Sequence, residues 1–218
     1  MYLTMYQSQE NFFAQAYRTG TDQWTNIPFA RRAHELGLYL PHGSLVLDLG
    51  AGRGRLLYEL AEMGFRGVGL ENNPELVIRG NNEILEKGLE KELRFVDGSV
   101  LDIPLEDQSF DAVVDIGLLH HLLPADFTKY VLETACVLKQ EGFFFLVVLS
   151  KNTKNYFSWH PNEVDSGEYE RDGVYYHFFS DKELQSLFEK DFEIRHIDHD
   201  TPFGPDSTDF AVVLLKKK

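Results

Sequence analysis

The chain has 218 residues, of which 43% are hydrophobic and 26% are charged, and its formal net charge is −14 at pH 7. This length and composition predict one domain of a soluble globular protein with its own core. The negative charge argues against nucleic acids and anionic membranes as partners, because proteins that bind polyanions usually carry a basic face. The basic run from Lys216 to Lys218 is expected to be a solvated tail.

Cysteine usage and targeting patterns favour a cytoplasmic protein. No stretch approaches the roughly 20 apolar residues that span a bilayer, and the first residues lack the basic and then apolar order of a signal peptide. Cys136 is the only cysteine, so no internal disulfide can form, which fits the cytoplasm. Its apolar helical surroundings predict that Cys136 lies in the core.

Apolar runs alternate with helical patterns from residue 44 onward, which predicts a parallel sheet with crossover helices. The expected strands span residues 44–49, 67–71, 92–96, 111–116 and 143–149. The expected helices span residues 55–63, 73–87 and 124–138. We expect the last of these helices to bury one apolar face, formed by Phe127, Val131, Leu132, Ala135 and Leu138.

The C-terminal third begins with a helix and ends with two strands. Ser180 and Glu183 form the pattern of a capping box, which predicts a structural role for Ser180 and a helix that continues to about residue 190. Two further strands are expected at residues 192–198 and 209–216. Because the turn-rich segment between them is too short for a crossover helix, we expect these strands to pair antiparallel.

The segment LVLDLGAGRGRLL, residues 45–57, indicates a cofactor site. Glycines at positions 50, 52 and 54 allow a sharp turn and a close approach to a ligand, and the N–H groups that open the next helix point toward that ligand. Glu71 ends the next apolar run about 20 residues later, where a carboxylate can hold a ribose diol. The sequence therefore predicts a nucleoside-type cofactor.

Two cofactors fit this pattern unequally. The dinucleotide fingerprint Gly-x-Gly-x-x-Gly requires glycine at position 55, where the chain has Arg55. A pyrophosphate would also avoid the carboxylate of Asp48, whereas the sulfonium and ammonium of S-adenosylmethionine tolerate it. Asp48 has the alternative role of capping local backbone N–H groups, and a nicotinamide-dependent oxidoreductase remains an alternative.

Four blocks resemble the class I S-adenosylmethionine-dependent methyltransferases: LVLDLGAGRGR, GVGLENN, FVDGSVLDIPLEDQSFDAVVDIGLLHHL and VLKQEGFFFLVVL. The resemblance implies a doubly wound, Rossmann-like α/β fold whose seven-stranded sheet is mostly parallel and ends in an antiparallel C-terminal hairpin. It also implies S-adenosylmethionine as the cofactor. We expect a single domain over residues 1–218, with a lid at 1–42, a cofactor-binding core at 43–150, and a substrate segment and terminal hairpin at 151–218.

The resemblance implies a set of cofactor-binding residues at the ends of the strands. They are Trp24, Asp48, Gly50, Ala51, Gly52, Glu71, Asn72, Gly98, Ser99, Val100, Asp115 and Ile116. Within this set the glycine loop approaches the methionine part, Glu71 takes the ribose hydroxyls, and a backbone carbonyl near Asp115 meets the ammonium. Ser99 stands where the family often has an Asp that meets the adenine amino group, and its hydroxyl can accept the same hydrogen bond.

Two further features of the resemblance concern the lid and a metal. The segment AYRTGTDQWTNIP resembles the lid of tellurite-resistance and thiopurine methyltransferases, in which a Trp covers the cofactor. Trp24 has the alternative role of anchoring an N-terminal helix to the core. Asp115 can serve as a metal ligand in catechol-type enzymes, but the Asp-Asn pair of those enzymes is replaced here by residues 150–152, so we predict no metal.

Residues 151–179 are rich in aromatic side chains, which predicts that they wall an apolar acceptor pocket, with packing on the sheet edge as the alternative. These side chains are Tyr156, Phe157, Trp159, Tyr169, Tyr175, Tyr176, Phe178 and Phe179. Histidine titrates near neutrality, and His120 and His177 are the preferred candidates for a general base over His121 and His160.

These patterns predict a methyltransferase that moves a methyl group by in-line displacement to an oxygen, nitrogen or sulfur of a small molecule. Because the methyl group is already activated, the protein mainly positions two reactants, and a base is needed only where the acceptor must lose a proton. The alternatives are a protein methyltransferase and a non-catalytic S-adenosylmethionine-binding protein. The oligomeric state is not predicted.

Overall fold

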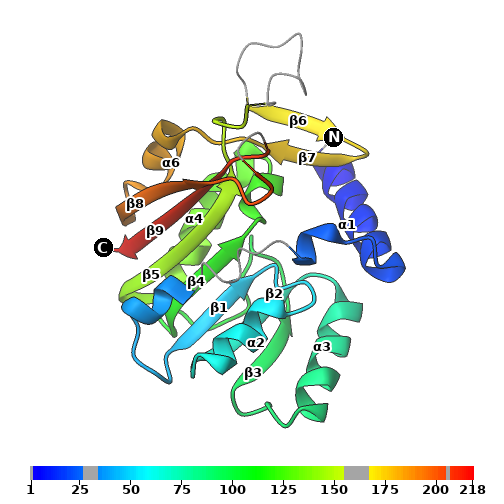
Figure 1. Ribbon diagram of the computed structural model, residues 1–218, viewed down its shortest axis with the longest axis vertical. Helices are drawn as coiled ribbons and strands as arrows, with labels where there is room; N and C mark the ends of the chain where they lie inside the picture. Colours follow the sequence, from blue (N-terminus) through cyan, green and yellow to red (C-terminus); the bar gives the residue numbers. More distant parts are fainter. Residues whose placement is uncertain (1, 27–33, 155–166, 205–206) are drawn as a thin grey trace.

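A computed structural model describes residues 2–26, 34–154, 167–204 and 207–218 of the chain. It shows one seven-stranded sheet with helices on both faces and a separate two-stranded hairpin (Figure 1). The strands of the sheet are β1 (Leu45–Leu49), β2 (Arg66–Glu71), β3 (Leu93–Asp97), β4 (Phe110–Ile116), β5 (Leu138–Leu149), β8 (Phe192–Asp200) and β9 (Phe210–Lys217). The hairpin consists of β6 (Glu168–Arg171) and β7 (Val174–His177).

The strand order is β3-β2-β1-β4-β5-β9-β8. Strands β1 to β5 pair parallel, and β9 pairs antiparallel with both β5 and β8. The predicted doubly wound sheet with an antiparallel terminal hairpin is thus confirmed. The chain moves outward in one direction from β1 to β3 and then returns to β4 on the other side of β1. Ligands of such sheets bind at this switch point, beyond the carboxyl ends of β1 and β4.

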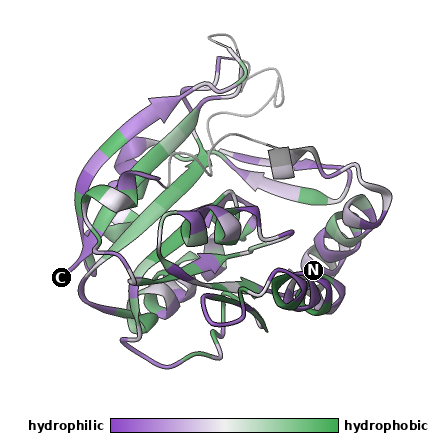
Figure 2. Ribbon diagram, turned by 60° about the horizontal axis from the view of Figure 1, so that its bottom comes forward, coloured by the Kyte–Doolittle hydropathy of each residue, from purple (hydrophilic) through white to green (hydrophobic). Residues whose placement is uncertain are grey.

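The two faces of the sheet have separate hydrophobic cores. Helices α2 (Arg55–Glu62) and α3 (Pro74–Glu86) belong to one face, and α4 (Phe127–Val137) and α6 (Asp181–Phe188) to the other. In β5 the side chains alternate between the cores, so that Phe144 packs in one and Phe145 in the other. A strand that is buried on both faces has a continuous apolar sequence, and the central strands are largely green, that is hydrophobic, in Figure 2.

Two predictions about α4 are wrong. Leu132 is 43% exposed and Cys136 is exposed, whereas the sequence analysis placed both in the core. The two residues are four positions apart and therefore share one face of the helix, which is the outward face here. The buried face contains Val131 and Ala135 instead. The predicted helix also begins as a short 3-10 turn, η4 (Pro124–Asp126), and its predicted last residue, Leu138, starts β5.

Several elements outside the predicted sheet were not given bounds by the sequence analysis. They are α1 (Tyr2–Thr19), the 3-10 turns η1 (Gln23–Asn26) and η3 (Leu119–His121), and the β6–β7 hairpin. Helix α1 packs against β7, and β7 against η3 (Figure 1). The predicted capping box is confirmed, because the Ser180 Oγ accepts a hydrogen bond from the Glu183 N–H. Among the described residues no helix is both long and apolar enough to cross a membrane.

We expect Tyr130→Phe to lower the free energy of unfolding by about 1–3 kcal/mol, the typical cost of leaving a buried polar group without its partner. The Tyr130 hydroxyl of α4 donates to the Asp115 carboxylate of β4 over 2.5 Å, and both residues are fully buried. Urea denaturation at pH 7 measures this change. Tyr39→Phe is the matched control, since Tyr39 is 42% exposed; an equal loss in both variants would contradict the prediction.

Candidate functional site

The loop between β1 and α2 has the conformation that its glycines allow. Gly50, Gly52 and Gly54 have φ angles of 71°, 54° and 75°. Residues with a side chain rarely adopt such positive φ angles. A Cβ atom at Gly52 would lie 2.6 Å from the Tyr17 hydroxyl of α1. The absent side chains therefore let α1 approach this loop closely, at the switch point of the sheet.

Glu71, the last residue of β2, lies against this loop. Its Oε2 accepts a hydrogen bond from the Gly52 N–H and its Oε1 accepts one from the Asn73 N–H, both over 2.9 Å. Each carboxylate oxygen has a second lone pair for a ligand hydroxyl. Burial raises the pKa of Glu71. The neighbouring Asn72 is exposed, and its Nδ2 lies 3.5 Å from the Glu10 carboxylate of α1.

Asp48 is a buried carboxylate without a hydrogen bond to any described residue. It lies in β1 beside Gly69 of β2 and Val114 of β4, and it is 5% exposed. Burial, together with the nearby carboxylates of Asp115 and Glu71, raises its pKa to about 8. Such a group is costly until it meets a partner. A cationic ligand beside the glycine loop would supply one, so these residues fit the ammonium and sulfonium of S-adenosylmethionine.

Asp115, at the end of β4, has its acceptors directed into the protein. Its oxygens accept hydrogen bonds from the N–H groups of Leu118 and Leu119, over 2.7 and 3.0 Å, besides that from Tyr130. The side chain therefore fixes the start of η3. For the predicted contact with the ammonium of the cofactor, this leaves the backbone groups of Asp115 and of the half-buried Ile116. No group of three potential metal ligands is arranged for an ion within the ranges that the structure describes.

The segment after β3 lies next to Glu71. The Gly98 N–H donates to the Glu71 carbonyl over 3.2 Å. Ser99 is exposed, and its Oγ accepts a hydrogen bond of 3.1 Å from the Leu101 N–H, so one lone pair of the hydroxyl stays available to accept another. Val100 is buried. The structure thus brings the predicted adenine and ribose residues to one place.

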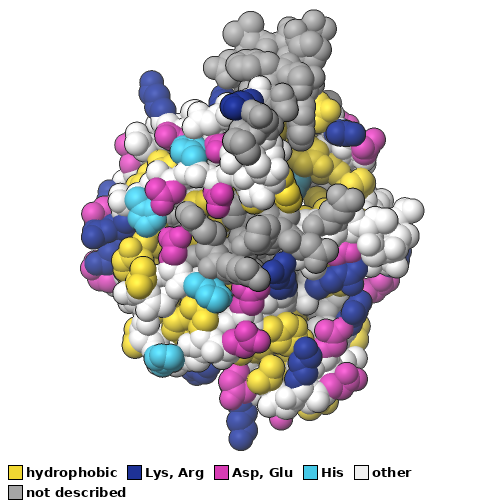
Figure 3. Space-filling model, viewed as in Figure 1, with side chains coloured by type: hydrophobic (Ala, Val, Ile, Leu, Met, Phe, Trp, Pro, Cys, Tyr) yellow, Lys and Arg dark blue, Asp and Glu magenta, His cyan; other side chains and the backbone are white. Residues whose placement is uncertain are grey.

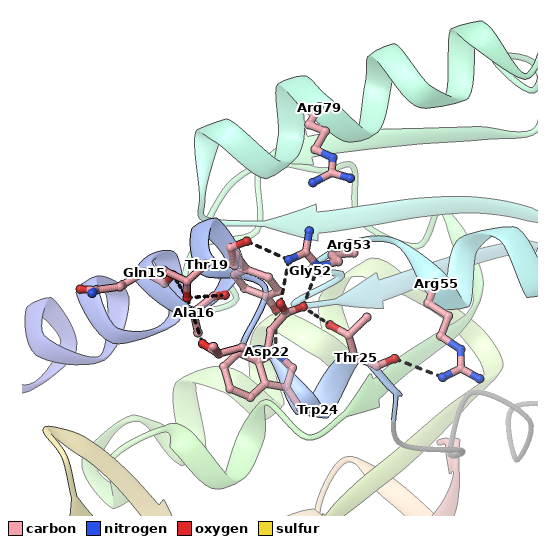
Figure 4. Close-up of polar contacts among 12 residues, drawn as sticks. Gln15, Ala16, Thr19, Asp22, Trp24, Thr25, Gly52, Arg53, Arg55 and Arg79 are labelled. Atoms are coloured by element: carbon pink, nitrogen blue, oxygen red, sulfur yellow. Dashed lines mark hydrogen bonds and ion pairs between the residues drawn. The ribbon is translucent and has the colours of Figure 1, made fainter.

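Four residues, which we call the clasp, hold α1 and η1 onto the glycine loop: Tyr17, Asp22, Trp24 and Arg53, of which the last three are labelled in Figure 4. Arg53 donates hydrogen bonds of 2.6 and 2.7 Å to the two Asp22 carboxylate oxygens and one of 2.8 Å to the Tyr17 carbonyl. The Trp24 Nε1 donates to the Tyr17 hydroxyl over 3.0 Å. Trp24 thus contacts the N-terminal helix at the loop where the cofactor is expected, which is compatible with both roles that the sequence allowed.

The sequence analysis missed Asp22 and Arg53. The only local signal is an arginine between two loop glycines, a position whose side chain has no core to enter. Its partner lies 31 positions earlier in the chain, beyond the reach of helix or strand periodicity.

Five ring side chains form what we call the aromatic wall: Tyr17, Trp24, Phe13, His121 and Tyr176. Successive ring centroids along this series lie 5.7, 5.3, 5.1 and 4.9 Å apart. Every member is half-buried and thus keeps some accessible surface. The wall connects the glycine loop with the β6–β7 hairpin and contains three of the predicted residues, Trp24, His121 and Tyr176. The predicted aromatic residues at 156, 157 and 159, and His160, lie outside the described residues.

The two histidines predicted as bases are engaged within the protein. His120 is buried, and its Nδ1 lies 3.4 Å from the Leu149 N–H, a long hydrogen bond in which the imidazole accepts. His177 is also buried, with Nε2 at 2.6 Å from the Glu183 carboxylate and Nδ1 at 3.3 Å from the Tyr175 hydroxyl. Burial lowers the pKa of His120 well below its ordinary value. Their catalytic roles stay predictions, and in each ring Nδ1 already has a neighbour at hydrogen-bonding distance, the Leu149 N–H for His120 and the Tyr175 hydroxyl for His177.

Comparisons with known proteins identify the family to which the chain is similar. Residues 47–146 match the model of the methyltransferase domain family. The chain is 30% identical over 148 residues to the uncharacterized methyltransferase sll0829 of Synechocystis, covering 66% of each protein. It is 36% identical over 102 residues to the uncharacterized methyltransferase YcgJ of Bacillus subtilis, covering 47% of this chain and 39% of that protein. The chain thus covers less than two thirds of the length of these curated relatives.

Among solved structures, Burkholderia thailandensis 1,6-didemethyltoxoflavin-N1-methyltransferase superposes with a TM-score of 0.80 at 23% identity, over 100% of this chain and 91% of that one. That structure contains 1,6-didemethyltoxoflavin and S-adenosylhomocysteine. Fold and site define an α/β protein whose glycine loop, at the switch point of the sheet, is hydrogen-bonded to an acidic residue at the end of the next strand. The chain belongs to the class I S-adenosylmethionine-dependent methyltransferases, and the cofactor of this family is S-adenosylmethionine.

The clasp gives a first prediction, on acid stability. Arg53 holds the pKa of Asp22 at about 2, below its ordinary 3.8, so the pair stabilises the fold above pH 3.8 and this contribution is lost as the pH falls through about 2. We expect Asp22→Asn to lower the free energy of unfolding by about 2 kcal/mol at pH 7. The difference in free energy of unfolding between the wild type and Asp22→Asn should fall to about half at pH 3, as measured by urea titration. A difference that is independent of pH would contradict the prediction.

Asp48 gives a second prediction, on proton release. With a pKa of about 8, Asp48 is protonated at pH 6.5 in the unligated protein, and a cationic ligand group favours the ionised form. Binding of S-adenosylmethionine at pH 6.5 should therefore release about one proton. Calorimetry in two buffers of different ionisation enthalpy measures this number. We expect Asp48→Asn to abolish the release and to weaken binding about 10-fold or more; unchanged release would contradict this role.

Proposed function

We propose that the protein transfers the methyl group of S-adenosylmethionine to an oxygen, nitrogen or sulfur atom of a small molecule. The observation that carries this proposal is the aromatic wall, which starts over the glycine loop and ends on the β6–β7 hairpin. Half-buried rings beside a cofactor site are suited to bind an apolar or planar acceptor and to exclude water from it. Residues 1–42 would act as the lid, 43–150 as the cofactor-binding core and 151–218 as the substrate side.

The cofactor would be held by the residues at the carboxyl ends of β1 to β4. Glu71 would accept hydrogen bonds from the ribose hydroxyls, and Asp48 would face the cationic methionine part above Gly50, Ala51 and Gly52. Asn72 and the segment Gly98, Ser99 and Val100 would surround the adenine. Asp115 and Ile116 would contribute backbone groups, and Trp24 would cover the cofactor from the lid.

The main requirement of methyl transfer is that the protein positions the two reactants. When bound, S-adenosylmethionine supplies a methyl group that is already activated on a sulfonium. The protein's part is to bring the acceptor atom in line with that methyl group, and positioning of this kind can contribute about 7–11 kcal/mol to lowering a barrier. The clasp fixes α1 at the cofactor end of the aromatic wall, so the wall and the glycine loop have a defined spacing.

A protein methyltransferase is the second candidate. It would require an open acidic groove for a basic peptide, which the net charge of −14 permits. On the face shown in Figure 3, however, acidic and basic side chains are interspersed over the coloured surface. The aromatic wall favours the small molecule. A non-catalytic S-adenosylmethionine-binding protein would share the cofactor site and lack turnover.

Calorimetric titration with S-adenosylmethionine, S-adenosylhomocysteine and NAD tests the cofactor. We expect the first two to bind and Glu71→Ala to weaken both by about 10-fold or more, because the ribose hydroxyls lose their hydrogen-bond acceptor. Glu86→Ala is the control, since Glu86 is exposed at the end of α3. Binding of NAD alone would overturn the proposal.

The acceptor class is tested by formation of S-adenosylhomocysteine with a mixture of small metabolites and, separately, with basic peptides. Turnover with the small metabolites supports the proposal. Turnover with peptides alone would establish the protein methyltransferase, and cofactor binding without any turnover would favour the non-catalytic alternative.

A further inference from the structure

His121 has a fixed tautomer. It ends η3, directly after the switch-point strand β4, and its Nδ1 lies 2.9 Å from the backbone oxygen of Tyr175 in β7. A carbonyl oxygen can only accept, so Nδ1 carries the proton. In the neutral ring the remaining lone pair is therefore on Nε2, which can only accept a hydrogen bond.

The Nε2 of His121 has no hydrogen-bond partner among the residues that the structure describes. The ring is bordered by Phe13, His120 and Tyr176, with ring centroids 5.1, 4.4 and 4.9 Å away. Burial lowers the pKa of His121 to about 4, so the imidazole is neutral at physiological pH. It is thus an acceptor among aromatic rings, half-buried within the aromatic wall.

Gln9 of α1 connects the two elements that set this tautomer. Its Nε2 donates to the His121 carbonyl over 3.1 Å, and its Oε1 accepts from the Tyr175 N–H over 2.8 Å. Gln9 is only 5% exposed. The side chain of Gln9, the imidazole of His121 and the backbone of Tyr175 thus close a ring of three hydrogen bonds that joins α1, η3 and β7.

We propose that His121 recognises the methyl acceptor by accepting a hydrogen bond at Nε2 from an N–H or O–H group of a planar ring, and that Gln9 is the residue that positions it. This inference rests on the proposed function and names the substrate class of the same site. A lone pair flanked by aromatic rings selects a neutral aromatic or heteroaromatic molecule that carries a donor. An anionic acceptor would find repulsion there, because the lone pair has the same sign.

Matched pairs of small probes test the recognition. In the complex with S-adenosylhomocysteine, we compare 2-naphthol with 2-methoxynaphthalene and benzimidazole with 1-methylbenzimidazole by saturation-transfer NMR and calorimetry. The wild type should bind the donor-bearing member of each pair about 10-fold more tightly or better, the value of one hydrogen bond of roughly 1.4 kcal/mol. Failure of both donor probes to bind, or equal binding within the pairs, would overturn the inference.

Variants assign this preference to particular residues. His121→Phe keeps a ring and removes Nε2, so it should abolish the preference while the affinity for S-adenosylhomocysteine stays within about twofold. His42→Phe, at an exposed position before the amino end of β1, whereas His121 follows the carboxyl end of β4, should change neither quantity. Gln9→Met should reduce the preference without affecting S-adenosylhomocysteine. If His121→Phe retains the preference, His121 is not the recognition residue.

A measurement on the wild type makes the test independent of the stability of the variants. In protein labelled with ¹⁵N-histidine, the His121 Nε2 should resonate as an unprotonated nitrogen and shift upfield on addition of 2-naphthol, but not of 2-methoxynaphthalene. Protonation on Nε2, or no shift with 2-naphthol, contradicts the proposal. Absence of S-adenosylhomocysteine binding in the wild type would instead refute the proposed function itself, so the two failures are distinguishable.

Discussion

Three buried carboxylates meet at the carboxyl ends of β1, β2 and β4, and the site is organised around their charge. Asp115 is satisfied by backbone N–H groups and Tyr130, and Glu71 by the N–H groups of Gly52 and Asn73. Asp48 alone lacks a partner and has a strongly raised pKa. The two well-packed cores that flank the sheet compensate for this unfavourable group, which is a typical arrangement at functional sites.

The N-terminal helix is attached to this centre through side chains. Its exposed ion pair, Arg18 with Glu75, has side chains that are 63% and 60% exposed, and such surface pairs contribute about 0–1 kcal/mol. The buried contacts matter more. Asp22 with Arg53 fixes the helix at the glycine loop, and Gln9 fixes it at η3 and β7. Through these two attachments the helix connects the cofactor end of the site with the proposed acceptor end.

The proposed acceptor end is made of side chains and is not specified by the fold. A TM-score of 0.80 with 23% identity shows that the sheet and its helices are shared while most side chains differ. Function depends on sites rather than on folds, so substrate choice must come from the side chains above the sheet. In the proposed function these are the half-buried rings of the aromatic wall and the hydrogen-bonded ring formed by Gln9, His121 and Tyr175.

The sequence by itself determined where most strands lie along the chain, the glycine loop, Glu71 after the second strand and the Ser180 cap, because each is a local pattern within a few residues. It did not determine which face of α4 is buried, as Leu132 and Cys136 show, because an apolar residue on a helix can point either way until its neighbours are in place. Gln9 and Tyr175 are 166 positions apart, and Asp22 and Arg53 are 31 apart. Contacts of this kind leave no period in the sequence, and only the packing of α1 over the finished sheet brings them together.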